Sequence, residues 1–214
     1  SVIITAGGIG KRMGAGIPKQ FIALNGKPIL VYTIQRFLEA LPDAQMILTL
    51  PEDYLTDGRE MLQSYSISNV EVIAGGVERF HSIKNALEIC TGELIAVHDG
   101  VRPFVSIDTI HQLFDEAKNY KAAIPFLTIN DSMRKLEGEK SGIVARSEYV
   151  TVQTPQVFDA TVLKKGYEQD YSDVFTDDAS VVEQLGYTIK LVPGNHENIK
   201  ITTSFDLKIS QLFI

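Results

Sequence analysis

Short runs rich in valine and isoleucine alternate along the chain with segments whose apolar residues recur at spacings of three and four. The short runs predict β-strands, and the periodic segments predict amphipathic helices. Strands are expected over residues 2–6, 46–50, 70–74, 94–97, 122–129, 150–154 and 188–192. Most of these runs lack an apolar–polar alternation, which indicates strands that are covered on both faces. The sequence therefore predicts an α/β fold with a mostly parallel, twisted sheet flanked by helices.

Two of the periodic segments mark helices. One apolar stripe contains Leu30, Ile34, Phe37, Leu38 and Leu41, and the other contains Ile107, Ile110, Leu113, Phe114 and Ala117. Ser106 stands before the second stripe as an N-cap, and Asp108 lies near the positive end of the helix dipole. A further helix is expected to begin at Thr176-Asp177-Asp178.

Residues 129–155 break this rhythm because they carry no helical stripe. Two short extended pieces flank a polar tip at 137–142, which predicts a β-hairpin. A two-stranded hairpin alone is marginal in water. This β-arm, at about residues 130–152, is therefore expected to pack on a second subunit or, alternatively, to form a surface flap on its own domain. The chain has 214 residues, of which 44% are hydrophobic. It can therefore form one domain over 1–214, with the arm as an appendage.

Composition excludes several classes of protein. The net charge of −7 and the pI of about 5.1 argue against nucleic-acid binding, which favours a basic face. No apolar run approaches the roughly 20 residues of a membrane span, and the four histidines lack metal-ligand spacing. The single cysteine, Cys90, allows no internal disulfide, and the first residues lack the plan of a signal peptide. We therefore expect a cytoplasmic protein that binds neither membrane nor nucleic acid.

The loop after the first predicted strand concentrates positive charge in this acidic chain. Its sequence, AGGIGKRMGAGIPKQF, combines glycines with Lys11, Arg12 and Lys19. Glycines let the backbone approach a phosphate and point N–H groups at it. Fixed cations would stabilise the charge that develops when a nucleophile attacks the α-phosphorus of a nucleoside triphosphate. The alternative is a solvated basic loop with glycines for turns.

Three phosphate-binding motifs compete for this loop. The P-loop pattern fails because Arg12 follows Gly10-Lys11 where serine or threonine is required. The dinucleotide pattern G-x-G-x-x-G fits poorly because Met13 stands at its third glycine. The third pattern, A-G-G-x-G-K-R-M followed by P-K, is the signature loop of sugar nucleotidyltransferases.

Two further segments follow predicted strands. The glycines of GGVERFHS, residues 75–82, would let a base approach the backbone, and the Ser82 hydroxyl could form a hydrogen bond to a pyrimidine edge. The alternative is a turn followed by a helix cap.

In VHDGVRP, Asp99 is placed to hold Mg²⁺, and Arg102 is placed to contact a phosphate. The alternative is that the two residues only brace the loop as an ion pair. For His98 the sequence leaves two alternatives: a residue of the core or a residue of the site.

Lys200 lies in the segment NIKIT near the end of the chain. If this segment is a strand, Lys200 faces away from Ile199 and Ile201. It then points either into the phosphate pocket or into solvent from an edge strand.

The motifs AGGIGKRM, PKQ, GGVERFHS, VHDGVRP, TPQVF, TDDAS and NIKIT occur in this order over nearly the whole chain. Together they closely resemble the 2-C-methyl-D-erythritol 4-phosphate cytidylyltransferase family of the non-mevalonate isoprenoid pathway. The resemblance implies a Rossmann-like nucleotidyltransferase fold with a protruding β-arm. It also implies transfer of a cytidylyl group from CTP to methylerythritol phosphate, with Mg²⁺ as cofactor and with release of pyrophosphate.

The resemblance also implies roles for individual residues. The catalytic residues would be Arg12, Lys19, Arg146 and Lys200. The nucleotide would be bound by Ala6, Gly7, Gly8, Gly10, Lys11, Gly76, Arg79 and Ser82. The acceptor or metal site would be lined by Asp99, Arg102, Ser132, Thr154 and Thr176, with Asp99 as the metal ligand. Members of the family are homodimers joined through the β-arm, so the arm residues would reach the partner's active site.

The chain departs from the family pattern at three places. Ala6-Gly7-Gly8 stands where the family usually has Ala-Ala-Gly, and this form is common in ribitol-5-phosphate cytidylyltransferases. That acceptor is therefore an alternative, although TDDAS is nearer the methylerythritol form. Val77 stands where an acidic residue is frequent, and Ser132 keeps a hydroxyl where threonine is common.

Two rival functions come from other classes. A dinucleotide-dependent oxidoreductase is disfavoured by Met13. A non-catalytic nucleotide-binding protein is more remote, because Lys19, Lys200 and Asp99 are all present.

Overall fold

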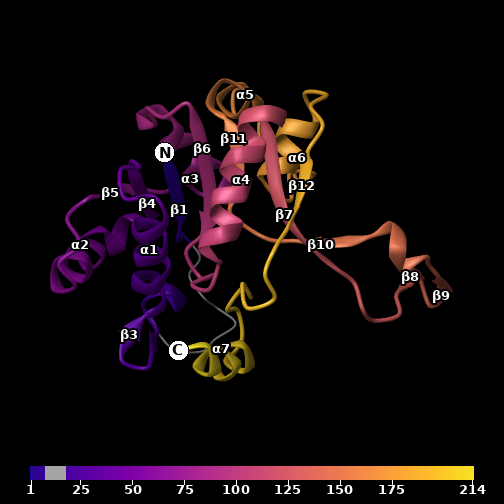
Figure 1. The fold of residues 1–214 in the computed structure, drawn as a ribbon, viewed down its shortest axis with the longest axis horizontal. Helices are drawn as coiled ribbons and strands as arrows, with labels where there is room; N and C mark the ends of the chain where they lie inside the picture. The colour runs from indigo at the N-terminus through magenta and orange to yellow at the C-terminus, as the bar shows by residue number, and fades with distance from the viewer. Residues whose placement is uncertain (8–17) are drawn as a thin grey trace.

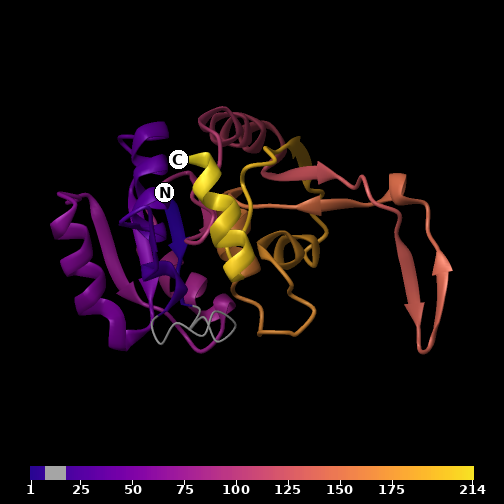
Figure 2. The same cartoon turned by 90° about the horizontal axis from the view of Figure 1, so that it is seen from below.

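A central sheet with helices on both faces forms the body of the molecule, and a thin two-stranded arm projects from it (Figures 1 and 2). The computed structural model describes residues 1–7 and 18–214. Within these residues the main sheet has eight strands, in the order β10-β7-β11-β6-β1-β4-β5, and β12 also pairs with β7. They are β1 (Val2–Thr5), β4 (Met46–Leu50), β5 (Val70–Ala74), β6 (Leu94–Asp99), β7 (Ala122–Thr128), β10 (Val150–Val152), β11 (Gln156–Asp159) and β12 (Lys190–Pro193).

The pairing of these strands is mostly parallel. β1 pairs in parallel with β4 and β6, β4 with β5, and β12 with β7. β11 inserts antiparallel between β6 and β7, and β10 is antiparallel to β7. The predicted α/β architecture is confirmed. The carboxyl ends of β1, β5 and β6 meet at one edge, where ligands bind in open α/β sheets.

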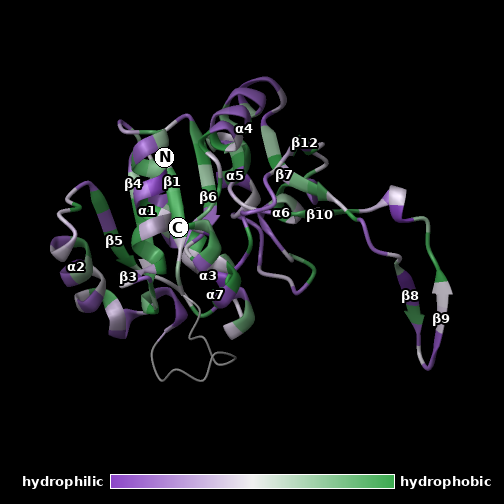
Figure 3. Ribbon diagram, turned by 60° about the horizontal axis from the view of Figure 1, so that its bottom comes forward, coloured by the Kyte–Doolittle hydropathy of each residue, from purple (hydrophilic) through white to green (hydrophobic). Residues whose placement is uncertain are grey.

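Helices cover both faces of the sheet. The apolar residues of α1 (Ile29–Ala40), α2 (Leu55–Ser64) and α4 (Ile107–Tyr120) pack on one face. Those of α3 (Arg79–Ile89), α5 (Ala160–Gly166) and α6 (Asp178–Glu183) pack on the other. In β1, Val2 and Ile4 belong to the first layer and Ile3 to the second, and all three are fully buried. Figure 3 shows the same concentration of apolar residues in the central strands.

Smaller elements complete the body. They are the hairpin of β2 (Ala23–Leu24) and β3 (Lys27–Pro28), the helix α7 (Ser204–Ser210), and 3₁₀ turns at Lys19–Phe21, Glu52–Tyr54, Arg146–Glu148 and Gln211–Phe213. The predicted N-cap is confirmed, because the Ser106 hydroxyl accepts the Thr109 N–H at 3.0 Å. Within the described residues, no helix combines the length and the apolarity that a membrane crossing requires.

The arm consists of β8 (Arg134–Glu137) and β9 (Lys140–Ile143), which pair antiparallel. Gly138 takes a positive φ of 62° in the turn between them, a conformation that favours glycine. All residues of both strands are exposed, and the arm stands far from the sheet in every view (Figures 1–3).

Two sequence-based predictions about strands were wrong. The short strand β11 was missed, because it has only four residues, begins with the polar Gln156 and follows Pro155. The segment around Lys200, whose side-chain direction was argued from strand alternation, has no regular structure. It is held by side-chain hydrogen bonds from Asn198 to Gln153 and to the Thr154 carbonyl, and not by a strand ladder.

Candidate active site

A cavity of about 290 Å³ opens at the carboxyl edge of the sheet. The predicted residues that line it come from the segment after β1, the segment before α1, the β5–α3 loop, the first turn of α3, the end of β6 and the C-terminal region. They are Ala6, Gly7, Lys19, Gly76, Arg79, Ser82, Asp99 and Lys200. The fold thus brings together residues that are far apart in sequence. Gly8, Gly10, Lys11 and Arg12 lie outside the described residues.

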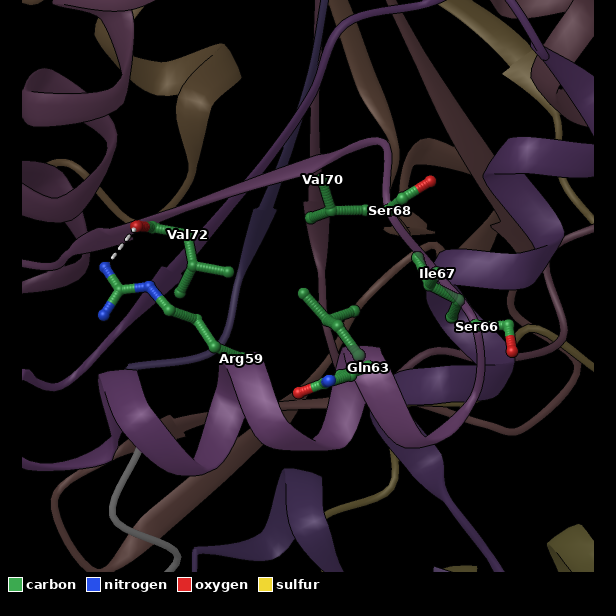
Figure 4. A pocket seen from close by; sticks show the side chains of 8 residues that line it. Arg59, Gln63, Ser66, Ile67, Ser68, Val70 and Val72 are labelled. Atoms are coloured by element: carbon green, nitrogen blue, oxygen red, sulfur yellow. Dashed lines mark hydrogen bonds between the residues drawn. The ribbon is translucent and has the colours of Figure 1, made fainter.

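A larger hollow, of about 430 Å³, lies between α2 and β5, which is the last strand at that side of the sheet (Figure 4). Among the described residues that line it, Arg59 alone is charged, and its guanidinium donates to the Val72 carbonyl at 3.3 Å. Because this groove gathers no group of charged or nucleophilic side chains, the smaller cavity is the candidate active site.

The β5–α3 loop requires glycine at Gly76. A Cβ added there would lie 2.3 Å from the His81 Cβ and 3.0 Å from the His81 carbonyl carbon. The Ser82 hydroxyl accepts the Gly76 N–H at 2.9 Å and donates to the Glu78 carbonyl at 3.1 Å. Ser82 therefore shapes the loop that lines the cavity, and its hydroxyl is engaged by the backbone.

Asp99 is the electrostatic centre of the cavity. Its carboxylate lies 3.0 Å from Lys200 Nζ, 3.2 Å from Arg102 Nε and 3.6 Å from Arg79 Nε. Burial by itself would raise the pKa of Asp99, but Arg79, Lys200 and Arg102 together hold that pKa well below its usual value. Asp99 is thus ionised at neutral pH and holds three cations from different parts of the chain at one point.

Arg79 joins Asp99 to a second carboxylate. Its two terminal nitrogens donate to both oxygens of Asp178 at 2.9 and 2.7 Å, a bidentate pair. Asp178 is fully buried and also accepts the Tyr167 hydroxyl at 2.5 Å. Burial, and then the neighbouring Asp178, raise the pKa of Tyr167. The predicted nucleotide ligand Arg79 thus lines the cavity while its terminal nitrogens point to a buried partner, which sequence reasoning missed.

Thr154, predicted to bind substrate, lies behind Asp99. It is buried, and its hydroxyl lies 3.1 Å from the Asp99 amide nitrogen and 3.1 Å from His98 Nδ1. His98 itself is fully buried, and burial lowers its pKa to about 4, although hydrogen bonding to the Arg102 carbonyl acts in the opposite direction. His98 is therefore neutral at pH 7.

The remaining predicted residues lie outside this cavity. Thr176 lines a neighbouring hollow of about 130 Å³ that shares Arg79 with it. Ser132 and Arg146 are exposed residues of the arm region, and the Arg146 guanidinium donates to the Asn130 carbonyl. Neither residue lines the cavity of its own chain, and the neighbouring β8–β9 arm projects away from the body (Figure 2).

Gln20 was missed as a site residue. It is buried, lines the cavity and donates to the Ala6 carbonyl, which ties the 3₁₀ turn after Pro18 to the end of β1. Its place in the PKQ motif was the only signal in the sequence.

The family model IspD, 2-C-methyl-D-erythritol 4-phosphate cytidylyltransferase, matches residues 1–214. The chain belongs to this family. Among curated members, the 2-C-methyl-D-erythritol 4-phosphate cytidylyltransferase of Phocaeicola vulgatus is 47% identical, covering 100% of this chain and 98% of its own length. The Bacteroides fragilis member is 46% identical, covering 100% of this chain and 99% of its own length.

Solved structures of the family share the fold. The 4-diphosphocytidyl-2C-methyl-D-erythritol synthase of Anaerococcus prevotii superposes with a TM-score of 0.85 at 26% identity, over 99% of this chain and 94% of its own. The cytidylyltransferase of Thermus thermophilus superposes with a TM-score of 0.79 at 29% identity, over 100% of this chain and 97% of its own.

Proposed function

We propose that the chain transfers the cytidylyl group of CTP to 2-C-methyl-D-erythritol 4-phosphate, giving 4-diphosphocytidyl-2-C-methyl-D-erythritol and pyrophosphate. The observation that carries this proposal is the meeting of Lys19, Lys200 and Asp99 with the Gly76 loop around one cavity. Membership of the family supplies the identity of the two substrates.

The reaction is an in-line displacement at phosphorus. A phosphate oxygen of the acceptor forms a bond to the α-phosphorus of CTP, and the bond from the α-phosphorus to the bridging oxygen breaks, so that pyrophosphate leaves with the electron pair. The acceptor phosphate is already an anion at neutral pH, so no strong base is required. The task of the protein is to align two anions and to stabilise the added charge, which fixed ammonium groups such as those of Lys19 and Lys200 can do.

Magnesium is part of the proposal. Among the described residues, no three histidine, cysteine, aspartate or glutamate side chains converge on one point. Within the described part of the chain, the cavity is lined by two carboxylate residues, Asp99 and Glu78, and Mg²⁺ commonly takes one or two carboxylates together with substrate phosphates and water. Asp99 would hold the ion, which would neutralise charge on the phosphates.

The arm supports a dimeric enzyme. Leu136 and Ile143 are 79% and 87% exposed on the isolated hairpin, and Val150 and Val152 at its base are also exposed. A hairpin with such apolar residues gains stability only by packing on another surface. In a homodimer joined through the arms, Ser132 and Arg146 would reach the acceptor site of the partner subunit.

The test is pyrophosphate release from CTP and Mg²⁺ with methylerythritol 4-phosphate and, side by side, with ribitol 5-phosphate. The proposal predicts turnover with the first acceptor and much slower turnover with the second. Faster turnover with ribitol 5-phosphate would show that this compound is the acceptor in place of methylerythritol 4-phosphate. CTP binding without turnover on either acceptor would refute catalysis.

A further inference from the structure

His98 is a fully buried polar residue that the proposed reaction does not use. It lies at the end of β6, directly before Asp99, and packs edge-on against the ring of Phe37 with centroids 4.7 Å apart. Successive residues of a strand point to opposite faces. Asp99 faces α3 and the cavity, whereas His98 faces α1, so the imidazole lies behind the site.

The hydrogen bonds of His98 define its protonation. Its Nε2 lies 2.9 Å from the Arg102 carbonyl oxygen. Because a carbonyl oxygen only accepts, Nε2 carries the proton, and in a neutral imidazole Nδ1 is then an acceptor. The Thr154 hydroxyl accepts the Asp99 N–H and can therefore donate its own hydrogen to Nδ1. Every polar group in this chain of bonds has a partner.

This chain of bonds joins the two ends of one turn. The turn begins at Asp99, whose N–H is bound through Thr154 to His98, and it ends at Arg102, whose carbonyl is bound to the same imidazole. Within the turn, the Arg102 N–H donates to the Asp99 carbonyl at 3.0 Å. From this turn, Asp99 and Val101 line the cavity, and the Arg102 guanidinium lies 3.2 Å from the Asp99 carboxylate.

We propose that His98 and Thr154 are positioning residues that fix the Asp99–Arg102 turn, and thereby the direction of the Asp99 carboxylate, from behind the active site. This inference rests on the proposed function and deepens it, because it moves Thr154 from contact with substrate to support of Asp99. A shift of about 1 Å in a reacting geometry can reduce a rate by about 10²-fold, so the support matters for rate even where the fold survives.

Paired variants test this role. Thr154→Val keeps the shape of the side chain and removes the hydroxyl, whereas Thr154→Ser retains it. His98→Asn retains an acceptor near the position of Nδ1 and cannot reach the Arg102 carbonyl. His111→Asn is the matched control, because His111 Nε2 also lies 2.9 Å from a carbonyl oxygen, that of Ala40, away from the site.

For folded variants, verified by circular dichroism and thermal melting, we expect Thr154→Val and His98→Asn each to lower kcat by about 10²-fold. KM for CTP should change little, because the Gly76 loop is untouched. Thr154→Ser and His111→Asn should behave like the wild type. The double variant of His98 and Thr154 should be no slower than the worse single variant, because the two residues act as one unit.

Three results would overturn the proposal. One is a folded Thr154→Val enzyme with wild-type kcat, and another is a double variant in which the two losses multiply. The third comes from the ¹⁵N NMR spectrum of the imidazoles, in which His98 must be the neutral Nε2–H tautomer at pH 7. A proton on Nδ1 would contradict the hydrogen-bond chain. The NMR result does not depend on turnover, so it separates a failure of this inference from a failure of the proposed function.

Discussion

Lys200 Nζ lies 3.0 Å from Asp99 Oδ2, although the two residues come from distant parts of the chain. The same carboxylate also contacts Arg102 and Arg79. A protein with a net charge of −7 thus gathers positive side chains at one edge of its sheet. Such a local field attracts a polyanion in spite of an acidic exterior, and several predictions depend on it.

Lys19→Ala is expected to lower kcat far more than the affinity for CTP. The loss of one preorganised charge donor reduces rate by roughly 10²- to 10³-fold. Steady-state kinetics and equilibrium binding of CTP measure the two effects separately. Lys118→Ala, which removes an exposed lysine of α4 that pairs only with Asp115 among the ion pairs of the described residues, is the control. An unchanged kcat in Lys19→Ala would remove this residue from the chemistry.

The pair of Arg79 and Asp178 is expected to serve both stability and activity. Asp178→Asn leaves the guanidinium without its buried partner and should lower the free energy of unfolding by about 2 kcal/mol, since Arg79 is partly exposed. The triple variant Arg79→Met, Asp178→Leu and Tyr167→Phe replaces the pair, and the hydroxyl that donates to it, by apolar groups and should restore the urea midpoint. Its kcat should remain below that of the wild type, because Asp99 has lost the cation that Arg79 supplies. Recovery of full activity along with stability would show that the pair is only structural.

The sequence predicted the sheet, the main helices and most of the cavity, because each depends on local signals. Buried strands without alternation, the Ser106 cap and glycines after strands are all visible in the chain. Asp178 was noted only as part of a helix start, since nothing local shows that its carboxylate meets Arg79. The family resemblance assigned Thr154 to the acceptor or metal site, but nothing local in the sequence shows that its hydroxyl lies 3.1 Å from the Asp99 amide nitrogen.

Stability is expected to fall as the pH is lowered from 6.5 to 4. The folded protein resists protonation of His98 down to a pKa of about 4, whereas the unfolded chain takes up this proton near the ordinary value of 6.5. The contribution of His98 is therefore complete above pH 6.5 and decreases by as much as about 3 kcal/mol on acidification. The lowered pKa of Asp99 also makes stability fall on acidification, but only at pH values below 3.8, the ordinary pKa of an aspartate.

Urea unfolding at several pH values checks this window. His98→Gln should flatten the dependence between pH 6.5 and 4, and His111→Asn should not. An equal slope in the wild type and in His98→Gln would mean that His98 does not cause the pH dependence.

Subunit mixing tests the arm. If the enzyme is the proposed homodimer, the Arg146→Ala and Lys200→Ala variants should each be nearly inactive, because each lacks one residue in both active sites. If an active site combines Arg146 of one subunit with Lys200 of the other, a mixed dimer contains one intact site. Activity should therefore appear when the two variants are unfolded together and refolded. No gain over the separate variants would contradict a shared active site.

The most direct measurement is a crystal structure with CTP and Mg²⁺ bound in the absence of acceptor. We predict the triphosphate in the cavity at the carboxyl ends of β1 and β6, the cytosine against the loop from Gly76 to Ser82, and Lys19 Nζ within hydrogen-bonding distance of an α-phosphate oxygen. A nucleotide bound elsewhere, or a triphosphate that leaves Lys19 and Lys200 facing solvent, would contradict the account.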